Sequence, residues 1–154
     1  MKLIWRQATK RDCPILAELN HQLIADEGHR NPMSVPELEQ RMRGWLDEGY
    51  EAVLFEADGE LAAYALYCAR PDEVYLRHFL VLLPRRRQGI GRQAIEVLRE
   101  RIWPKGRRLT VSVLTQNEVG LKFWRAVGFQ DYCLTLEIMP PGPGSTGAPA
   151  FPSL

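Results

Sequence analysis

The sequence predicts a single α+β domain with a mixed sheet and helices on its faces. Strand-like and helix-like patterns follow one another in the order β α α β β β α β α β, and an Asp-Gly turn joins two of the strands as an antiparallel hairpin. The chain has 154 residues, of which 45% are hydrophobic and 25% charged, which is typical of one globular domain.

Periodicity and capping residues predict the elements of the first half. A strand over 2–7 precedes a helix over about 10–26, and a second helix runs to about residue 46 from the capping box Ser34-Val35-Pro36-Glu37. Strands over 51–57 and 60–69 flank the hairpin turn Asp58-Gly59. A further strand over 74–83 is apolar throughout, as expected of a central strand.

The second half continues the alternation of helices and strands. We expect a helix over about 88–103, a strand over 108–115, a short helix over 118–126 and a last strand over 129–138. Residues 140–154 contain five prolines and three glycines, a composition that does not bury enough surface to order itself. The chain is therefore expected to form one domain over 1–139, followed by a disordered tail over 140–154.

Composition excludes several classes of protein. The cysteines Cys13, Cys68 and Cys133 are too few and too widely spaced for a disulfide framework or a zinc site, so no metal is expected. No apolar run reaches the roughly 18 residues of a membrane span, and the first residues lack the apolar core of a signal peptide. We therefore expect a cytoplasmic protein with no membrane partner.

The formal net charge of +1 conceals three segments of different charge. Residues 1–76 carry 8 basic and 14 acidic side chains, residues 77–108 carry 10 and 2, and the remainder carries 2 and 3. A short basic segment in a nearly neutral chain indicates either one bound anionic partner or a solvated basic helix face. The charge alone leaves both interpretations open.

The basic segment coincides with the junction between a strand and a helix. Its residues are Pro84-Arg85-Arg86-Arg87-Gln88-Gly89-Ile90-Gly91-Arg92. The first turn of a helix exposes unpaired N–H groups at the positive end of the helix dipole, and glycines allow a phosphate to approach them. The segment therefore predicts a pyrophosphate cradle with arginines that reach further phosphates.

Three nucleotide-binding motifs compete for this segment. A P-loop needs G-x-x-x-x-G-K-[ST], which the sequence lacks. The run Gly89-Ile90-Gly91-Arg92-Gln93-Ala94 fits the dinucleotide pattern G-x-G-x-x-A, but too little chain follows for a series of βαβ units. The third motif explains more residues.

Arg86-x-x-Gly89-x-Gly91 resembles the acyl-CoA-binding motif [RQ]-x-x-G-x-[GA] of the GCN5-related N-acetyltransferases (GNAT). Further along, Asn117-x-x-Gly120-x-x-Phe123-Trp124-x-x-x-Gly128-Phe129 resembles that family's second signature. Two motifs in the right order, each on the right element, are more specific than either alone. The resemblance implies a mixed, mostly antiparallel sheet with about four flanking helices, in which two splayed central strands form an acyl-CoA cleft.

The resemblance also implies acetyl-CoA as cofactor and an N-acetyltransferase that acts on a primary amine of a small molecule or a protein. By that likeness the backbone of Phe79, Leu80 and Val81 pairs with pantetheine, and the N–H of Leu80 or Val81 stabilises the oxyanion. The pyrophosphate would contact Arg86, Arg87, Gln88, Gly89, Ile90, Gly91 and Arg92. The pantetheine arm would contact Asn117, Gly120, Phe123 and Trp124.

A general base is required because a protonated amine has no lone pair with which to attack the thioester. The candidate bases are Glu27, His78 and Tyr75, with Asp26 and Glu73 also considered. Asp26, Glu27 and His29 are expected to bind the acceptor, and the acidic N-terminal part favours a cationic one. Structural roles compete with these: a solvated helix end for Glu27 and a hydrogen-bonded core residue for His78. In a regular strand Tyr75 and Arg77 face away from His78.

Trp124 departs from the family pattern, because a tyrosine usually stands there and protonates the departing thiolate, whereas indole is a poor acid. Water, Tyr132 or Tyr75 would replace it, or the thiolate would leave unaided. The departure motivates an alternative function, a non-catalytic acyl-CoA-binding or sensing domain. Nucleic-acid binding is not expected, because the arginine run is short and tied to a glycine loop.

The sequence also lacks the hairpin that many family members carry after the Gly-Phe pair of the second motif. A homodimer in which a second subunit completes that sheet edge is therefore a further hypothesis.

Overall fold

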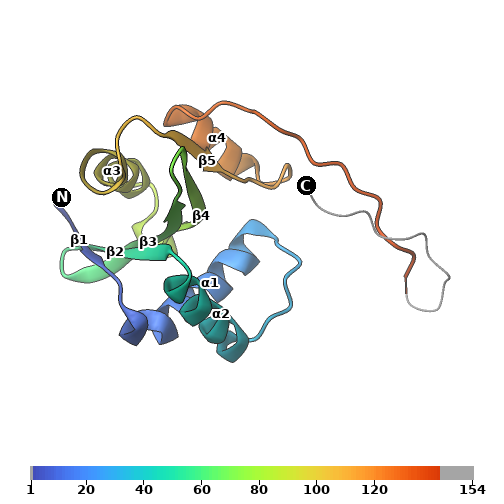
Figure 1. The fold of residues 1–154 in the computed structure, drawn as a ribbon, viewed down its shortest axis with the longest axis horizontal. Coiled ribbons are helices and arrows are strands. Elements are labelled where there is room, and N and C mark those ends of the chain that lie inside the picture. The colour runs from blue at the N-terminus through green and yellow to red at the C-terminus, as the bar shows by residue number, and fades with distance from the viewer. Residues whose placement is uncertain (1, 143–154) are drawn as a thin grey trace.

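The computed structural model describes residues 2–142 and contains a five-stranded sheet in the order β1-β2-β3-β4-β5 (Figure 1). The strands are β1 (Leu3–Gln7), β2 (Tyr50–Ala57), β3 (Glu60–Ala69), β4 (Glu73–Val81) and β5 (Arg108–Val111). The α-helices of these residues are α1 (Cys13–Glu27), α2 (Val35–Asp47), α3 (Ile90–Val97) and α4 (Glu118–Ala126). Short helical turns cover Lys10–Asp12, Leu83–Arg85 and Leu98–Ile102.

The predicted mixed sheet is confirmed. Strands β1 to β4 form an antiparallel meander, and β5 lies parallel to β4 after the crossover through α3. The β2–β3 hairpin turns at Asp58 and Gly59, whose φ angles of 54° and 78° match the turn that twists with its strands. The capping box predicted at Ser34 is also present, because Glu37 N–H donates to Ser34 Oγ.

The sheet separates two apolar layers. On one face, α3 and α4 contribute to a cluster that includes Phe55, Tyr67 and Ile95. On the other face, α1 and α2 cover a cluster that includes Leu16 and Tyr64. Because side chains alternate along a strand, β4 supplies both layers and its backbone lies between them. None of the helices in residues 2–142 combines the length and apolar character needed to cross a membrane.

The predicted strand over 129–138 is wrong: this stretch pairs with no other strand among the described residues. Residues 129–142, here called the C-terminal arm, run as extended chain away from α4 (Figure 1). Tyr132, Leu134, Leu136 and Ile138 on the arm are 63–85% exposed. The alternating pattern suits a strand, but residues 2–142 provide no neighbouring strand for it. Residues 143–154 of the predicted tail lie outside the described residues.

Candidate active site

β4 and β5 stop pairing partway along the sheet, and the region between the separated strands is here called the candidate cleft. The last paired residues are Leu76 and Val111, although β4 continues to Val81. Beyond Leu76, β4 therefore has no paired strand on the side of β5 among the described residues, although the Val81 carbonyl accepts a hydrogen bond from Arg86. This separation of the two strands agrees with the splayed pair that the motifs predicted.

A β-bulge lies at the point of separation. Leu76 pairs with Tyr67 and His78 pairs with Leu66, so that Arg77 has no partner on β3. The extra residue overturns the expectation for a regular strand, in which Arg77 and His78 would face opposite sides. Both residues instead contact Trp45 of α2: the Arg77 Cζ lies 4.9 Å from the indole centroid, and the His78 ring centroid 5.3 Å from it.

The loop between β4 and α3 forms a concave row of backbone groups. Arg87 and Gly89 both have left-handed backbones, with φ angles of 62° and 77°. Such alternation turns successive N–H groups toward one point and makes an anion-binding nest. The first-turn N–H groups of α3, from Ile90 onward, have no carbonyl of their own helix to bind and extend the nest.

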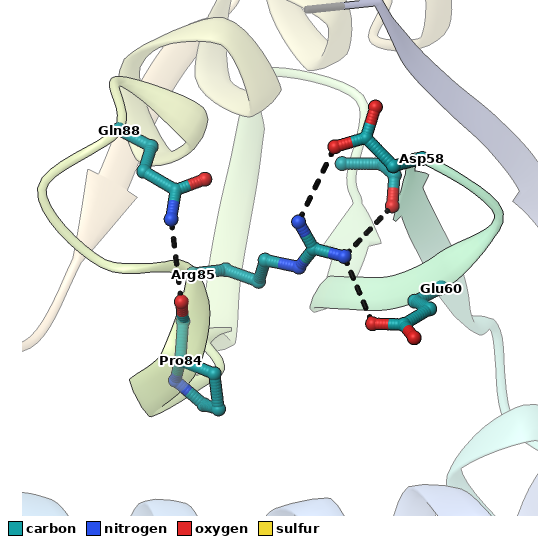
Figure 2. A network of polar contacts seen from close by, with 6 residues as sticks. Asp58, Glu60, Pro84, Arg85 and Gln88 are labelled. Atoms are coloured by element: carbon teal, nitrogen blue, oxygen red, sulfur yellow. Dashed lines mark hydrogen bonds and ion pairs between the residues drawn. The ribbon is translucent and has the colours of Figure 1, made fainter.

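The arginines of the loop divide into different roles. Arg85 points away from the nest and holds the β2–β3 hairpin through Asp58, Glu60 and the Ala57 carbonyl (Figure 2). Arg86 donates to both carboxylate oxygens of Asp26, at 2.7 and 3.2 Å, and through Nε to the Val81 carbonyl.

The remaining polar side chains at the start of α3 contact only backbone carbonyls. Arg92 donates weakly to the Ala126 carbonyl at 3.5 Å, and Gln88 donates to the Pro84 carbonyl. The guanidinium group of Arg87 has no partner in residues 2–142. Arg87, at the left-handed position, is thus the loop arginine whose charge is free for a ligand.

The second motif forms the start of α4. The Asn117 side chain caps this helix, because its Oδ1 accepts the Gly120 N–H at 3.0 Å. A Cβ on Gly120 would lie 2.4 Å from Asn117 Nδ2, which explains why glycine stands there. The Nδ2 group has no protein acceptor in residues 2–142 and can donate to a ligand in the cleft.

Aromatic rings form the floor of the cleft. Phe79 of β4 stacks on Phe123 with 6.0 Å between centroids, and Trp124 packs edge-on against both rings and against Phe129. Trp124 is only 7% exposed. The indole thus belongs mainly to the core beneath the cleft rather than to its open surface.

Glu27 and His29 lie together at the C-terminal end of α1. Glu27 Oε1 is 3.2 Å from His29 Nε2. Desolvation raises the pKa of the Glu27 carboxyl above its ordinary value, although His29 acts in the opposite direction. A carboxylate that is partly withdrawn from water is a stronger base than a solvated one. Asp26, expected to bind the acceptor, is instead paired with Arg86.

His78 is a half-buried residue whose ring contacts aromatic side chains of α2 and β3. Its Nδ1 lies 3.2 Å from the hydroxyl of Tyr64, which is fully buried. Desolvation, together with the charges of Arg41 and Arg77, lowers the pKa of His78 to about 3. The imidazole is therefore uncharged and weakly basic at neutral pH, which agrees with the structural role considered for it.

The other candidates for proton transfer lie where the strands are still paired. Tyr75 pairs with Thr110 of β5, and its ring faces the guanidinium groups of Arg70 and Arg77. Tyr132 lies on the arm beside Arg108, which pairs with Glu73.

Glu73 itself accepts a hydrogen bond from Thr110 and forms ion pairs with Arg70 and Arg108. These contacts fix the register of β4 against β5 and occupy the Glu73 carboxylate.

Side chains from α2, β2 and β3 complete the surroundings of the bulge but were not among the predicted site residues. They are Arg41, Trp45, Tyr50 and Tyr64. No motif marks them, because three separate elements bring them together. The apolar spacing of α2 indicated only that Trp45 is packed.

Comparison with known proteins identifies the family to which the chain is similar. The sequence model described as "Acetyltransferase (GNAT) family" matches residues 12–129. Comparison with curated protein sequences finds no match.

Solved structures of acetyltransferases share the fold. One is the aminoglycoside N-acetyltransferase AAC(6')-Iy in complex with CoA, which is 18% identical over 90% of this chain and 94% of its own, with a TM-score of 0.70. An aminoglycoside acetyltransferase from an uncultured soil metagenomic sample, in complex with sisomicin, is 16% identical over 89% and 95%, with a TM-score of 0.69. The ribosomal-protein-alanine N-acetyltransferase of Brucella melitensis biovar Abortus 2308 is 18% identical over 90% and 99%, with a TM-score of 0.66.

Proposed function

The chain belongs to the acetyltransferase (GNAT) family and is an N-acetyltransferase that uses acetyl-CoA, and we propose that it acetylates a primary amine by direct attack of the deprotonated amine on the thioester. The observation that carries this proposal is the parting of β4 from β5 beyond Leu76 and Val111, next to the nest at the start of α3. A slot between strands beside an anion-binding helix terminus suits a long ligand with a diphosphate at one end.

The residues present fit this cofactor. The nest around Arg87 and Gly89 would hold the pyrophosphate, and the free edge of β4 over Phe79, Leu80 and Val81 would pair with the amide groups of pantetheine. Asn117 Nδ2 is available to donate a hydrogen bond to a carbonyl of pantetheine. Acetyl-CoA supplies a thioester carbon that accepts the amine.

Two groups of the chain would handle charge and protons in the reaction. A backbone N–H just after the bulge, at Leu80 or Val81, would donate to the oxygen that gains negative charge. Glu27 would remove the proton from the amine, directly or through water, because burial raises the pKa of its carboxyl and makes the carboxylate a stronger base than a solvated one. Because Trp124 is buried and its indole is a poor acid, we propose that water protonates the departing CoA thiolate or that the thiolate leaves unprotonated.

The experiment that tests the function is release of free CoA thiol from acetyl-CoA with a panel of primary amines. Turnover with an amine, together with a mass increase of one acetyl group on that amine, is the expected result. Tight binding of acetyl-CoA without turnover on any amine would contradict the proposal and favour a binding or sensing domain.

We also propose that the partner of the C-terminal arm is a second copy of this chain. The arm alternates apolar side chains at Tyr132, Leu134, Leu136 and Ile138, and all four are exposed. Two ion pairs fix the ends of the arm: Arg125 pairs with Asp131 near α4, and Arg30 pairs with Glu137. Exposed strands of this kind invite pairing with another chain.

The open outer edge of β5 is the acceptor proposed for the partner's arm. Each copy has one arm and one such edge, so that mutual exchange closes a symmetric dimer without leaving a free site. The exchange would bury the four apolar side chains and supply the strand that the sequence predicted over 129–138.

Size-exclusion chromatography with light scattering tests this exchange. The expected result is a dimer that becomes monomeric when Leu134 and Leu136 are both changed to Asp. The matched control is Ile4→Asp, which places one carboxylate on β1, at the opposite edge of the sheet. A monomeric wild-type protein, or a dimer lost only in Ile4→Asp, would overturn the proposal.

A further inference from the structure

Two arginines next to the bulge share one aromatic side chain. The Cζ of Arg41 lies 4.3 Å from the centroid of Trp45, and the Cζ of Arg77 lies 4.9 Å from it. Arg77 also lies 5.5 Å from the ring of Tyr50 and 5.4 Å from that of Tyr75. The rings orient the two guanidinium groups without neutralising their charge.

No carboxylate compensates this pair of charges in residues 2–142. The hydrogen-bond acceptors are neutral: Arg41 Nη2 donates to Asn20 Oδ1 at 3.2 Å, and Arg77 Nε donates to the Tyr50 hydroxyl at 3.0 Å. Other arginines that reach nearby carboxylates do form ion pairs, among them Arg43, Arg85 and Arg86. Arg41 and Arg77 thus share one aromatic contact while neither has a carboxylate partner in residues 2–142.

Buried polar groups around Arg41 also lack partners. The Nε of Arg41 is buried without a hydrogen bond, and so is the Nδ2 of Asn20, a residue that is 1% exposed. Burial, and then repulsion from Arg77, lower the pKa of Arg41. Two like charges near unsatisfied donors are costly unless an anion offsets them.

The pair lies on the face of the sheet that is covered by α1, the helix that ends at the proposed base Glu27. Arg77 is the bulged residue itself, so its backbone stands where β4 leaves β5. Trp45 touches His78, and His78 is bonded to Tyr64, all on the face covered by α1 and α2. The pyrophosphate nest lies on the loop that enters α3, on the other face, so these arginines are not needed for the cofactor.

We propose that Arg41 and Arg77 bind an anionic group, a carboxylate, on the acceptor, so that the substrate is a small amino acid carrying both the reacting amine and an acid. This inference rests on the proposed function and specifies its acceptor. The planar guanidinium group matches the two oxygens of a carboxylate, and the two guanidinium carbons lie 4.3 and 4.9 Å from the Trp45 ring centroid. A polycationic acceptor is disfavoured here, because the same two charges repel it.

Paired acceptors test the inference. The probes are ω-amino acids of increasing chain length, each compared with its own carboxamide, and phosphoethanolamine compared with ethanolamine. The readouts are thiol release for KM and kcat, and calorimetric binding of each amine to the complex with CoA. We expect kcat/KM for an amino acid to exceed that for its amide by about 10- to 100-fold, as for a charge-assisted hydrogen bond.

Variants assign the effect to the arginines. Arg77→Gln should raise KM for the amino acid by about 10-fold or more and leave kinetics with the amide unchanged. Arg77→Lys retains the positive charge but not the planar guanidinium group, and its KM for the amino acid should lie between those of wild type and Arg77→Gln. Arg43→Gln, on the same helix as Arg41 but paired with Glu39, is the matched control and should behave as wild type.

The outcomes separate the two proposals. Equal kcat/KM for acids and amides, or a preference for polyamines, would overturn the inference and leave the acetyltransferase function intact. A preference for phosphoethanolamine over every amino acid would also overturn it. Absence of turnover with every amine would overturn the proposed function, while the calorimetric comparison of acid and amide would still decide whether the arginines bind a carboxylate.

Discussion

At the scale of single residues, the chemistry of the site depends on which groups lose contact with water. Glu27 and His78 are both desolvated, and desolvation moves their pKa values in opposite directions because it disfavours whichever form is charged. Glu27 becomes a stronger base, whereas His78, with a pKa of about 3, stays neutral over the working pH range. The pH dependence of the reaction should therefore follow Glu27.

Glu27→Gln should lower kcat by about 100-fold or more, because loss of a general base typically costs that much. In the wild type kcat/KM should fall as the pH drops through the raised pKa of Glu27, since only the carboxylate accepts a proton. The variant should lack this acidic limb. A pH profile of kcat/KM for both proteins checks the prediction, and a variant with wild-type kcat would contradict it.

Stability provides the control for Glu27. A carboxyl group with a raised folded-state pKa favours the folded state below its unfolded pKa, and this contribution is lost as the pH rises through the folded pKa. At pH 7 the buried charge therefore opposes folding. Urea unfolding should show Glu27→Gln to be at least as stable as wild type, so that its loss of activity is not a loss of fold.

At the scale of elements, the sequence predicted what is local and missed what depends on contacts between distant segments. The glycine loop before α3 and the Asp58-Gly59 turn are determined by neighbours in the chain, so their patterns were sufficient. The Asn117 cap was not predicted, because the second motif indicated only a contact with pantetheine. The bulge at Arg77 depends on the register of β4 against β3, which no local pattern encodes. The arm has the alternation of a strand, but alternation does not say which chain holds the partner strand.

The contact between α3 and α4 gives a prediction at this scale. A Cβ on Gly91 would lie 2.9 Å from Cε1 of Phe123, whose ring is confined by Phe79 and Trp124. Gly91→Ala should therefore destabilise the protein by about 1–3 kcal/mol through overpacking, and weaken CoA binding because α3 carries the nest.

Gly44→Ala is the matched control for this prediction. Gly44 lies inside α2 with no atom near its missing Cβ, so alanine there should stabilise by about 0.5–1 kcal/mol. Urea unfolding and CoA titration of both variants measure the difference. A stabilised Gly91→Ala protein with wild-type affinity for CoA would show that the two helices have room to separate.

At the scale of the whole molecule, part of the basic middle segment pairs in space with the acidic N-terminal part. Asp26, Asp58 and Glu60 from the acidic N-terminal part pair with Arg85 and Arg86 from the basic middle. Because these carboxylates already have arginine partners, the acidic composition of residues 1–76 does not by itself favour a cationic acceptor. The sheet separates the remaining functions, with the cofactor nest toward the α3 face and the uncompensated arginines toward the α2 face.

Because the nest forms only in the folded chain, CoA should stabilise the whole domain. At a concentration 100 times its Kd the ligand adds about 2.7 kcal/mol, which for this size corresponds to a rise in Tm of roughly 5–10 °C. Gly89→Glu places bulk and negative charge in the nest and should abolish the rise, as should Gly91→Glu.

Gly106→Glu separates loss of the nest from backbone strain. Gly106 has a φ angle of 76°, against 77° at Gly89, so glutamate strains the backbone equally at both positions. Gly106 lies in the turn before β5, outside the nest, and its variant should lose some Tm without ligand yet keep the full increment with CoA. Thermal unfolding of the three proteins with and without CoA measures this, and a Gly89→Glu protein that keeps the wild-type increment would place the pyrophosphate elsewhere.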